Sequence, residues 1–500
     1  MSRIAKTLTA ASTLALFAGM TQASTGAFPE CIASPTEQGT QEIAKLMFHQ
    51  LPIEHQHKIA LNGGIGSEDF DLNAFQNGAA IDISEEIKVD LTAHEYLDML
   101  VSDQLASRLT QEQWNILNAI ADSLDADRTV PHLCFAPDTD REFAFAVNQL
   151  IEFQFQVRFQ QTSRWNRTAT DGSGLTQGEP TTLTYSFVPD GTTIPNSGLG
   201  LGSGSSVLFA WLNSRYGSPA NWQPLFDQVF DRWAELTGLS YVYEPNDDGA
   251  NTNGPVGILG LRGDVRIAAY NFANDGNFGV LAYNNFPNDG DMIFDAYDSF
   301  FNTTSNNSLR LRNVAAHEHG HGLGMLHVCP DNQTKLMEPF ASTQYDGPQL
   351  DDILNGQRHY GDPTEPNNDP GSAIDMGDFD ASAFFALSNV SIDDNSDYDM
   401  FTFNLTERAQ LTFVIGPQAG QYQSGSQTSS CNNGNLVNYN AIQDLEIDLY
   451  EGTNLITPLA GANSEGAGGL DTLVYDLEDT GVYYVIVSAA SNVNNVQRYQ

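Results

Sequence analysis

Residues 317–327 read HEHGHGLGMLH and contain the pattern H-E-x-x-H-x-x-G-x-x-H. Residues four apart share one face of a helix, so His317 and His321 can present imidazole nitrogens to one metal ion, with Glu318 beside it. Gly324 would let the chain leave the helix through a left-handed conformation and bring back His327 as a third ligand. Three neutral imidazoles with one open position are typical of a catalytic zinc. His319 points away from this face, and we expect it to be exposed.

The chemistry that this pattern predicts is hydrolysis of a peptide bond. Zinc lowers the pKa of a water in the open position and polarises a substrate carbonyl. Glu318 would accept the proton of that water and return it to the leaving amine. The alternative is a chance run of histidines on a solvated helix, which is disfavoured because all five positions of the pattern match at once.

The segment from residue 165 to about 361 resembles the catalytic domain of the matrixins, the metzincin family that includes the matrix metalloproteinases. Residues 335–339 place Met337 where that family carries its Met-turn beneath the zinc ligands. Residues 182–187 and 239–243 resemble two of its strands, and residues 350–361 its last helix. An apolar stripe resembles its first long helix: Trp222, Phe226, Val229, Phe230 and Trp233. The resemblance implies an α+β fold with a mixed twisted sheet and a zinc-binding helix.

The same resemblance implies how a substrate would bind. Residues 275–282 resemble a calcium loop that runs into an edge strand, and in the family this strand pairs with an extended substrate. That role would belong to Val280, Leu281 and Ala282. The wall of the primary specificity pocket would be formed by Pro339, Phe340 and Ala341.

The resemblance also implies metal sites besides the first zinc. Asp275, Asp295 and Asp298 would bind a first calcium ion, and Asp264 and Asp291 a second, because hard calcium prefers carboxylate oxygens. Plain turn formation and solvation is the alternative for these aspartates. Matrixins usually bind a second, structural zinc through histidines, but this chain has Tyr283 and Ile293 there. We therefore expect one zinc.

Residues 1–23 combine a basic start, an apolar stretch and a small-residue cleavage site, which predicts a secretory signal peptide and an exported protein. Residues 24–150 predict a mainly helical propeptide, with capping boxes at 92–95 and 110–113. The processing site falls between residues 139 and 165, and the alternation in residues 153–159 predicts a strand.

Cys134 begins C-x-x-P-D, part of the cysteine switch with which matrixin propeptides block zinc. The arginine that usually precedes this cysteine and the glycine that usually follows it are absent here. One interpretation of Cys134 is still a thiolate that binds zinc and keeps the enzyme latent, because a thiolate is a better zinc ligand than water. A disulfide with Cys31 is the other interpretation, with Cys329 and Cys431 paired or free.

Residues 151–362 form the predicted metallopeptidase domain, and a Pro- and Asn-rich linker follows it. Residues 363–500 contain period-two segments at 397–403, 445–450 and 481–487, which predict an all-β sandwich. They resemble the pre-peptidase C-terminal domain of exported bacterial peptidases, which implies a module that contacts a polymer or surface, or one that is removed after secretion.

The 63 acidic and 21 basic residues argue against nucleic acid as a partner. No stretch reaches about 18 uninterrupted apolar residues, so no membrane span is expected. The main hypothesis is thus a secreted, calcium-stabilised zinc endopeptidase made as a zymogen, acting on proteins or peptides. The alternative is a non-catalytic secreted binding protein that attaches through the β-sandwich.

Overall fold

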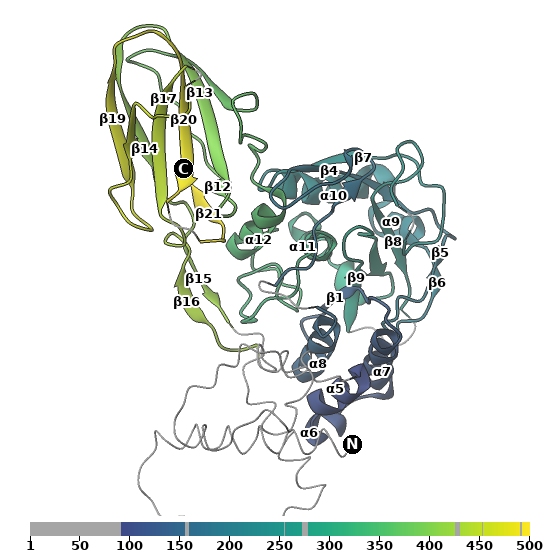
Figure 1. The fold of residues 1–500 in the computed structure, drawn as a ribbon. Helices are drawn as coiled ribbons and strands as arrows, with labels where there is room; N and C mark the ends of the chain where they lie inside the picture. The colour runs from purple at the N-terminus through teal and green to yellow at the C-terminus, as the bar shows by residue number, and fades with distance from the viewer. Residues whose placement is uncertain are drawn as a thin grey trace, which may run out of the picture.

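The computed structural model describes residues 92–155, 160–254, 256–272, 279–425, 431–452, 454–490 and 493–500. The predicted signal peptide, Cys31 and Asp275 lie outside these residues. Figure 1 shows a group of N-terminal helices, a central body of sheet and helices, and a C-terminal β-rich body. Among the described residues, no helix is both long and apolar enough to cross a membrane.

A mixed six-stranded sheet forms the middle of the central body, in the spatial order β1, β9, β10, β8, β4, β7. Strands β10, β8, β4 and β7 run parallel, whereas β9 is antiparallel to β10 and β1 is antiparallel to β9. Within the predicted metallopeptidase domain, residues 151–362, β9 is the outermost strand, and β1 from the N-terminal segment pairs with its outer side. The bounds are β1 (His132–Phe135), β9 (Val280–Asn284), β10 (Met292–Asp295), β8 (Val265–Tyr270), β4 (Thr181–Phe187) and β7 (Leu239–Tyr243).

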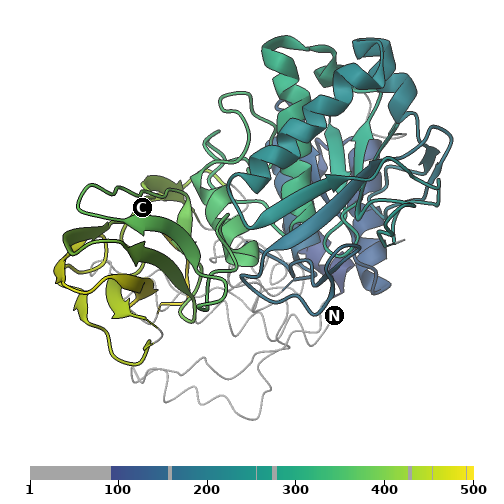
Figure 2. The same ribbon diagram turned by 90° about the horizontal axis from the view of Figure 1, so that it is seen from above.

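Helices pack against this sheet in the central body (Figure 2). The parallel strands β4 and β7 need a crossover, which α9 (Leu208–Tyr216) and α10 (Pro219–Ala234) provide. The predicted apolar stripe of α10 is buried and packs near α11 (Ser305–Gly322). Helix α12 (Leu350–Tyr360) comes last. Short elements complete this part: β2 (Arg167–Thr168) with β3 (Gly172–Ser173), β5 (Thr193–Ile194) with β6 (Gly204–Ser205), and the 3-10 helix η1 (Ser299–Asn302).

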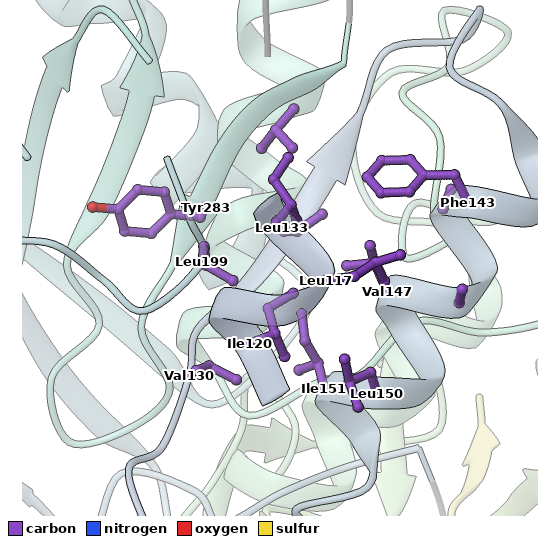
Figure 3. Close-up of a cluster of buried hydrophobic side chains, with 14 of the residues drawn as sticks. Leu117, Ile120, Val130, Leu133, Phe143, Val147, Leu150, Ile151, Leu199 and Tyr283 are labelled. Carbon is purple, nitrogen blue, oxygen red and sulfur yellow. The ribbon is translucent and has the colours of Figure 1, made fainter. Parts of the chain in front are cut away.

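The N-terminal helices are α5 (Ala93–Leu100), α6 (Asp103–Ala106), α7 (Gln111–Asp125) and α8 (Arg141–Glu152). Both predicted capping boxes are confirmed, at Thr92 and Thr110. Figure 3 shows that α7, α8 and β1 share one apolar cluster with Leu199 and Tyr283 of the central body. The helices are thus packed onto the sheet rather than set apart from it.

The strand predicted for residues 153–159 is wrong at its beginning, and residues 156–159 are not described. Phe153 caps α8 and its ring stacks on Tyr96, with the centroids 4.7 Å apart. This packing favours a turn over an extended strand, so tertiary contacts override the alternating pattern. The predicted domain boundary at residue 150 lies inside α8.

The C-terminal body is a β structure around a core of its own. The strands predicted at 397–403, 445–450 and 481–487 are confirmed as β13 (Tyr398–Leu405), β17 (Leu445–Glu451) and β20 (Gly481–Ala489). They form a five-stranded sheet with β11 (Ile374–Phe379) and β18 (Ala460–Ala462). Three pairs remain: β14 (Ala409–Ile415) with β19 (Asp471–Leu477), β12 (Val390–Ile392) with β21 (Gln497–Tyr499), and β15 (Gln421–Ser424) with β16 (Asn435–Asn438).

A disulfide joins the C-terminal body to the central one. Of the alternatives for these cysteines, the structure shows Cys329 paired with Cys431 across 102 residues. Two backbone bonds flank the disulfide: the amide of Asp331 donates to the Cys431 carbonyl over 2.8 Å, and that of Gly425 to the Cys329 carbonyl over 2.9 Å. Because Cys431 lies between β15 and β16 in the sequence, this hairpin is linked to the chain at Cys329, two residues after His327.

Candidate metal centre

Helix α11 and the turn after it bring the three histidines together. His317 and His321 lie one helical turn apart, and α11 ends at Gly322. Gly324 has a φ of +98°, as the sequence predicts, and a side chain there would also meet the backbone of Ser163. The turn returns the chain so that His327 faces the helix, and all three imidazoles are buried.

The three Nε2 atoms converge. Nε2 of His317 lies 3.1 Å from Nε2 of His321 and 3.1 Å from Nε2 of His327. Each Nδ1 instead faces an oxygen: the Leu336 carbonyl at 2.7 Å, the Met325 carbonyl at 2.8 Å and the Asn148 amide oxygen at 3.0 Å, respectively. Because these oxygens accept hydrogen bonds, the Nδ1 atoms carry the protons, and three Nε2 lone pairs point at one another.

Lone pairs that face one another in a buried site repel, and a cation bound between them would remove this repulsion. Burial lowers the pKa of His317 to about 4, so the imidazole is neutral, as a metal ligand must be. Tetrahedral zinc with bonds of about 2.0–2.1 Å sets its ligand nitrogens roughly 3.3–3.4 Å apart. The three histidines therefore fit a zinc ion closely.

Glu318 and Cys134 lie on the His317 side of this centre. The carboxylate of Glu318, the thiol sulfur of Cys134 and a ring nitrogen of His317 lie within 4.8 Å of one another. Cys134 is a free, buried thiol. Burial raises the pKa of Glu318 well above its ordinary value, and neither of its carboxylate oxygens makes a hydrogen bond to a described residue. Burial and the charge of Glu318 raise the pKa of the Cys134 thiol.

Strand β1 lies between the two segments for which the sequence predicts substrate binding. On one side it pairs with β9, with Cys134 opposite Ala282 and Phe135 opposite Val280. On the other side the Phe135 amide donates to the Pro339 carbonyl over 3.1 Å, and the Ala341 amide donates to the Phe135 carbonyl over 3.0 Å. Both predicted substrate-binding segments, 280–282 and 339–341, are thus hydrogen-bonded to the N-terminal segment.

The loop that contains Met337 lies next to the histidine centre and is fixed by hydrogen bonds. The Asp352 carboxylate accepts hydrogen bonds from the amides of Leu336 at 2.7 Å and Met337 at 3.0 Å. The Leu336 carbonyl in turn faces Nδ1 of His317. A buried ion pair between Lys335 and Glu338, at 3.0 Å, closes the loop. Asp352 therefore orients a ligand histidine through one residue of backbone.

We expect Gly320→Ala to destabilise the protein by about 1–3 kcal/mol, because extra volume in a packed core forces a shift. A Cβ at Gly320 would lie 2.3 Å from the Met337 sulfur. Urea denaturation of single and double variants would measure the effect, since Met337→Ala should relieve part of it. Gly466→Ala is the control, because no atom lies within 4 Å of a Cβ there. Equal losses for the two glycine variants would show that the Met337 contact is not tight.

The predicted exposure of His319 is wrong. Its side chain is fully buried, and Nε2 lies 2.7 Å from the Tyr241 hydroxyl. The prediction that it points away from the ligand histidines is compatible with this position, because the ring packs against Phe230 of α10. The face of α11 opposite the metal centre is covered by a second helix rather than by solvent.

The predicted calcium ligands fall into two groups. Asp295 and Asp298 end β10 and cap η1, and burial raises their pKa values to about 7 and about 6, respectively. One oxygen of Asp295 makes no hydrogen bond to a described residue, whereas their predicted partner Asp275 is not described. Asp295 and Asp298 are thus two of the three predicted ligands of the first site, and carboxylate oxygens are the donors that a hard cation prefers.

Asp264 and Asp291 have protein partners. Asp264 accepts from the Ala169 amide at 2.8 Å and from both the amide and the hydroxyl of Thr184. One oxygen of Asp291 accepts from the amide of Asn253 at 3.1 Å, and the other, like one oxygen of Asp295, makes no hydrogen bond to a described residue. Neither residue belongs to a group of three or more possible metal ligands in the described part of the chain. Tyr283 and Ile293, at the positions of the family's second zinc, pack in the cluster shared with the N-terminal helices.

The sequence analysis did not identify three residues that the structure places at the centre. His132 precedes Cys134 by two, and the period of a strand could have placed both on one face. Asn148 contacts His327 across 179 residues and Asp352 contacts the Leu336 amide across 16 residues, so neither contact belongs to a local motif.

A histidine triad of this kind, with a buried glutamate beside it and a methionine loop below, is the site of a zinc metalloprotease. The Matrixin family model matches residues 213–361, which confirms the resemblance for the central part of the chain. No curated protein matches the sequence.

Two solved structures show distant similarity. The pre-peptidase C-terminal domain of a collagenase from Bacillus anthracis is 15% identical, with 27% of this chain and 98% of that chain covered and a TM-score of 0.17. Myroilysin is 13% identical, with 37% of this chain and 71% of that chain covered and a TM-score of 0.17.

Proposed function

We propose that this protein is a secreted zinc endopeptidase of the matrixin type, made as a zymogen, in which Glu318 is the general base. The convergence of three Nε2 atoms, each with an oxygen behind its Nδ1, carries the proposal. Held by His317, His321 and His327, zinc would polarise the substrate carbonyl and acidify water. Glu318 would take the proton from the attacking water and deliver it to the leaving amine.

The position of β1 supports latency of the uncleaved chain. An extended substrate needs the backbone groups of segments 280–282 and 339–341, and β1 engages both. The Cys134 thiol near His317 and Glu318 adds a donor at the position where water must act. Activation would then require cleavage within the chain and departure of β1.

Casein zymography of secreted material, with and without a zinc chelator, tests the main proposal. We expect a clearing band that the chelator abolishes and that added zinc restores. Clearing that ignores the chelator, or none after the N-terminal segment has been cleaved, would favour the alternative, a secreted binding protein that uses its β-rich domain.

We expect Cys134→Ser to release activity from the intact chain, because a hydroxyl is a far weaker zinc ligand than a thiolate. The measurement is hydrolysis of a quenched fluorescent peptide by uncleaved protein, with mass spectrometry to show that it is uncleaved. Ser107→Ala, a change at an exposed residue on α6's end, is the control and should leave latency intact. A Cys134→Ser chain that folds but stays fully latent would contradict a blocking role for the thiol.

Calcium binding remains part of the proposal for Asp295 and Asp298 with Asp275. Two buried carboxylates side by side repel each other unless a cation or protons compensate. Asp291 likewise has a buried carboxylate oxygen without a hydrogen bond to a described residue, so both predicted sites are kept in the proposal. Thermal unfolding with and without calcium would test both, with Asp298→Asn and Asp264→Asn compared.

Export and a surface-contacting role of the C-terminal domain complete the proposal. Residues 1–23 support export by their composition. The disulfide between Cys329 and Cys431 means that a cut in the linker would leave the C-terminal domain covalently attached. N-terminal sequencing of the secreted protein would test the first point.

A further inference from the structure

Arg141 of the N-terminal segment is bound at a site that belongs to the central body. Its guanidinium pairs with the carboxylate of Asp331, a side chain that is 4% exposed. The same guanidinium lies over the ring of Phe340, with Cζ 5.1 Å from the ring centroid. Phe340 is one of the residues predicted to line the primary specificity pocket. A buried carboxylate and an aromatic face together bind a basic side chain through an ion pair and a cation–π contact.

The charge of Asp331 is matched by Arg141 rather than by the other cation of the same loop. That cation, Lys335, donates to the Glu338 carboxylate over 3.0 Å and to the Pro330 carbonyl over 3.0 Å. Burial raises the pKa of the Asp331 carboxyl, the charge of Arg141 opposes this rise, and Glu338 adds to it. Arg141 therefore stabilises the ionised form of Asp331, which would lose this counter-ion if Arg141 left.

The position of Arg141 in α8 is otherwise unfavourable for a basic residue. Asp140 caps α8 by accepting from the Phe143 amide over 3.0 Å, so Arg141 is the first residue of the helix. A positive charge there faces the positive end of the helix dipole. The contact with Asp331 offsets this cost, so the site on the central body, rather than the helix, accounts for an arginine at this position.

A cavity of about 210 Å³ adjoins this contact. Its lining combines residues of the N-terminal segment and of the central body, among them Pro137, Arg141, Phe300, Asp331 and Phe340. Pro137 lies three residues after Cys134, whose thiol is near Glu318. An extended chain advances about 3.3 Å per residue. A peptide on the path of β1 would therefore reach this cavity roughly 10 Å, or about three to four residues, beyond the metal centre.

We propose that Asp331 and Phe340 form a substrate subsite for a basic side chain, and that Arg141 occupies this subsite in the uncleaved chain. The subsite would bind an arginine or lysine about three to four residues from the cleaved bond. A cut after Arg141 and before residue 165, within the range predicted for processing, would let Arg141 leave together with β1. This inference rests on the proposed peptidase and adds a substrate class to it.

The test compares peptides that differ in one side chain, cleaved by the activated wild-type enzyme. Arginine is replaced by citrulline, which has nearly the same shape but no charge, at the third and fourth positions on either side of the cleaved bond. We expect arginine at one of these positions to raise kcat/KM about tenfold or more over citrulline, the range of a hydrogen bond to a charged group. The difference should lie in KM, because the contact is remote from the reacting atoms.

Asp331→Asn keeps the shape of the side chain and removes its charge. This variant should cleave the arginine and citrulline peptides at nearly equal rates, and the citrulline peptide as fast as the wild type does. Asp346→Asn is the matched control, because it removes the charge of an aspartate that is 60% exposed and pairs with Arg312. It should keep the preference for arginine. Should Asp331→Asn fail to fold, Phe340→Leu tests the aromatic wall of the subsite, with thermal unfolding to establish that the variant is folded.

The outcomes separate this inference from the function on which it rests. Equal cleavage of the arginine and citrulline peptides by an active wild-type enzyme would overturn the subsite and leave the peptidase intact. A preference for arginine that survives in folded Asp331→Asn would do the same. Absence of peptide hydrolysis by the activated wild-type enzyme would overturn both.

Discussion

Glu318→Ala should lower peptide hydrolysis by a factor of about 10²–10⁴, the usual contribution of a positioned general base. One carboxylate oxygen lies within 4.8 Å of a ring nitrogen of His317 and of the thiol sulfur of Cys134 on β1. Glu318 is the one described carboxylate that is grouped with a ligand histidine. In the variant, no side chain would therefore take the proton from water and pass it to the leaving amine. Initial rates on a fluorescent peptide, after the same activation treatment for each variant, measure the loss.

Metal content must be measured alongside, because loss of zinc would also abolish activity. Glu318 is not one of the three converging ligands, so the variant should bind zinc in the same ratio as the wild type. Glu235→Ala removes an exposed glutamate on α10's C-terminal end and should keep full activity. A Glu318→Ala protein that holds zinc and turns over substrate normally would eliminate this residue as the base.

The double variant Cys329→Ser, Cys431→Ser should lose up to about 4–5 kcal/mol of stability, the chain-entropy value for a loop of about 100 residues. The disulfide closes a loop of 102 residues and lies just beyond His327. Its removal should therefore also loosen the third ligand and weaken zinc binding. Urea denaturation and zinc titration of the same samples would measure both effects.

Cys134→Ser is the matched control for the urea measurement alone, because it also removes a buried cysteine but leaves the Cys329–Cys431 bond. The zinc titration of the double variant is compared with that of the wild type, since Cys134 is itself a proposed zinc donor. A second measurement uses limited proteolysis of the linker followed by electrophoresis. The C-terminal fragment should separate from the rest only after reduction. Unchanged stability in the double variant would show that the contacts of Tyr422 with Asp351 and of the flanking backbone hold the two bodies together without the disulfide.

The metal centre was predictable because its signal is local. His317, His321 and His327 lie within 11 residues, so the geometry of one helix and one glycine turn suffices to bring them together. The capping boxes at Thr92 and Thr110 are local in the same sense, and both are found. His319 shows where this reasoning fails, because helix geometry gives the direction of a side chain but not what covers it.

Other features depend on contacts between distant parts of the chain. The pattern of residues 280–282 indicated a strand, but its position inside the sheet depends on the arrival of β1 from about 150 residues earlier. Phe153 belongs to an alternating pattern that predicts a strand, but in the structure it is the C-cap of α8 and its ring stacks on Tyr96. The choice between the disulfide alternatives for Cys329 likewise required the C-terminal hairpin to be placed beside it.

The amino-acid order alone therefore predicted the kind of chemistry: which residues would bind a metal, which carboxylate would serve as base and where a methionine loop follows. Folding in three dimensions added what controls that chemistry. His132 and Cys134 reach the centre because β1 pairs with β9, and ligand histidines are supported by Asn148 of α8 and, through the Leu336 backbone, by Asp352 of α12. The physical reason is the range of the interactions, since local backbone geometry is written in adjacent residues, whereas packing partners are selected only when the whole core assembles.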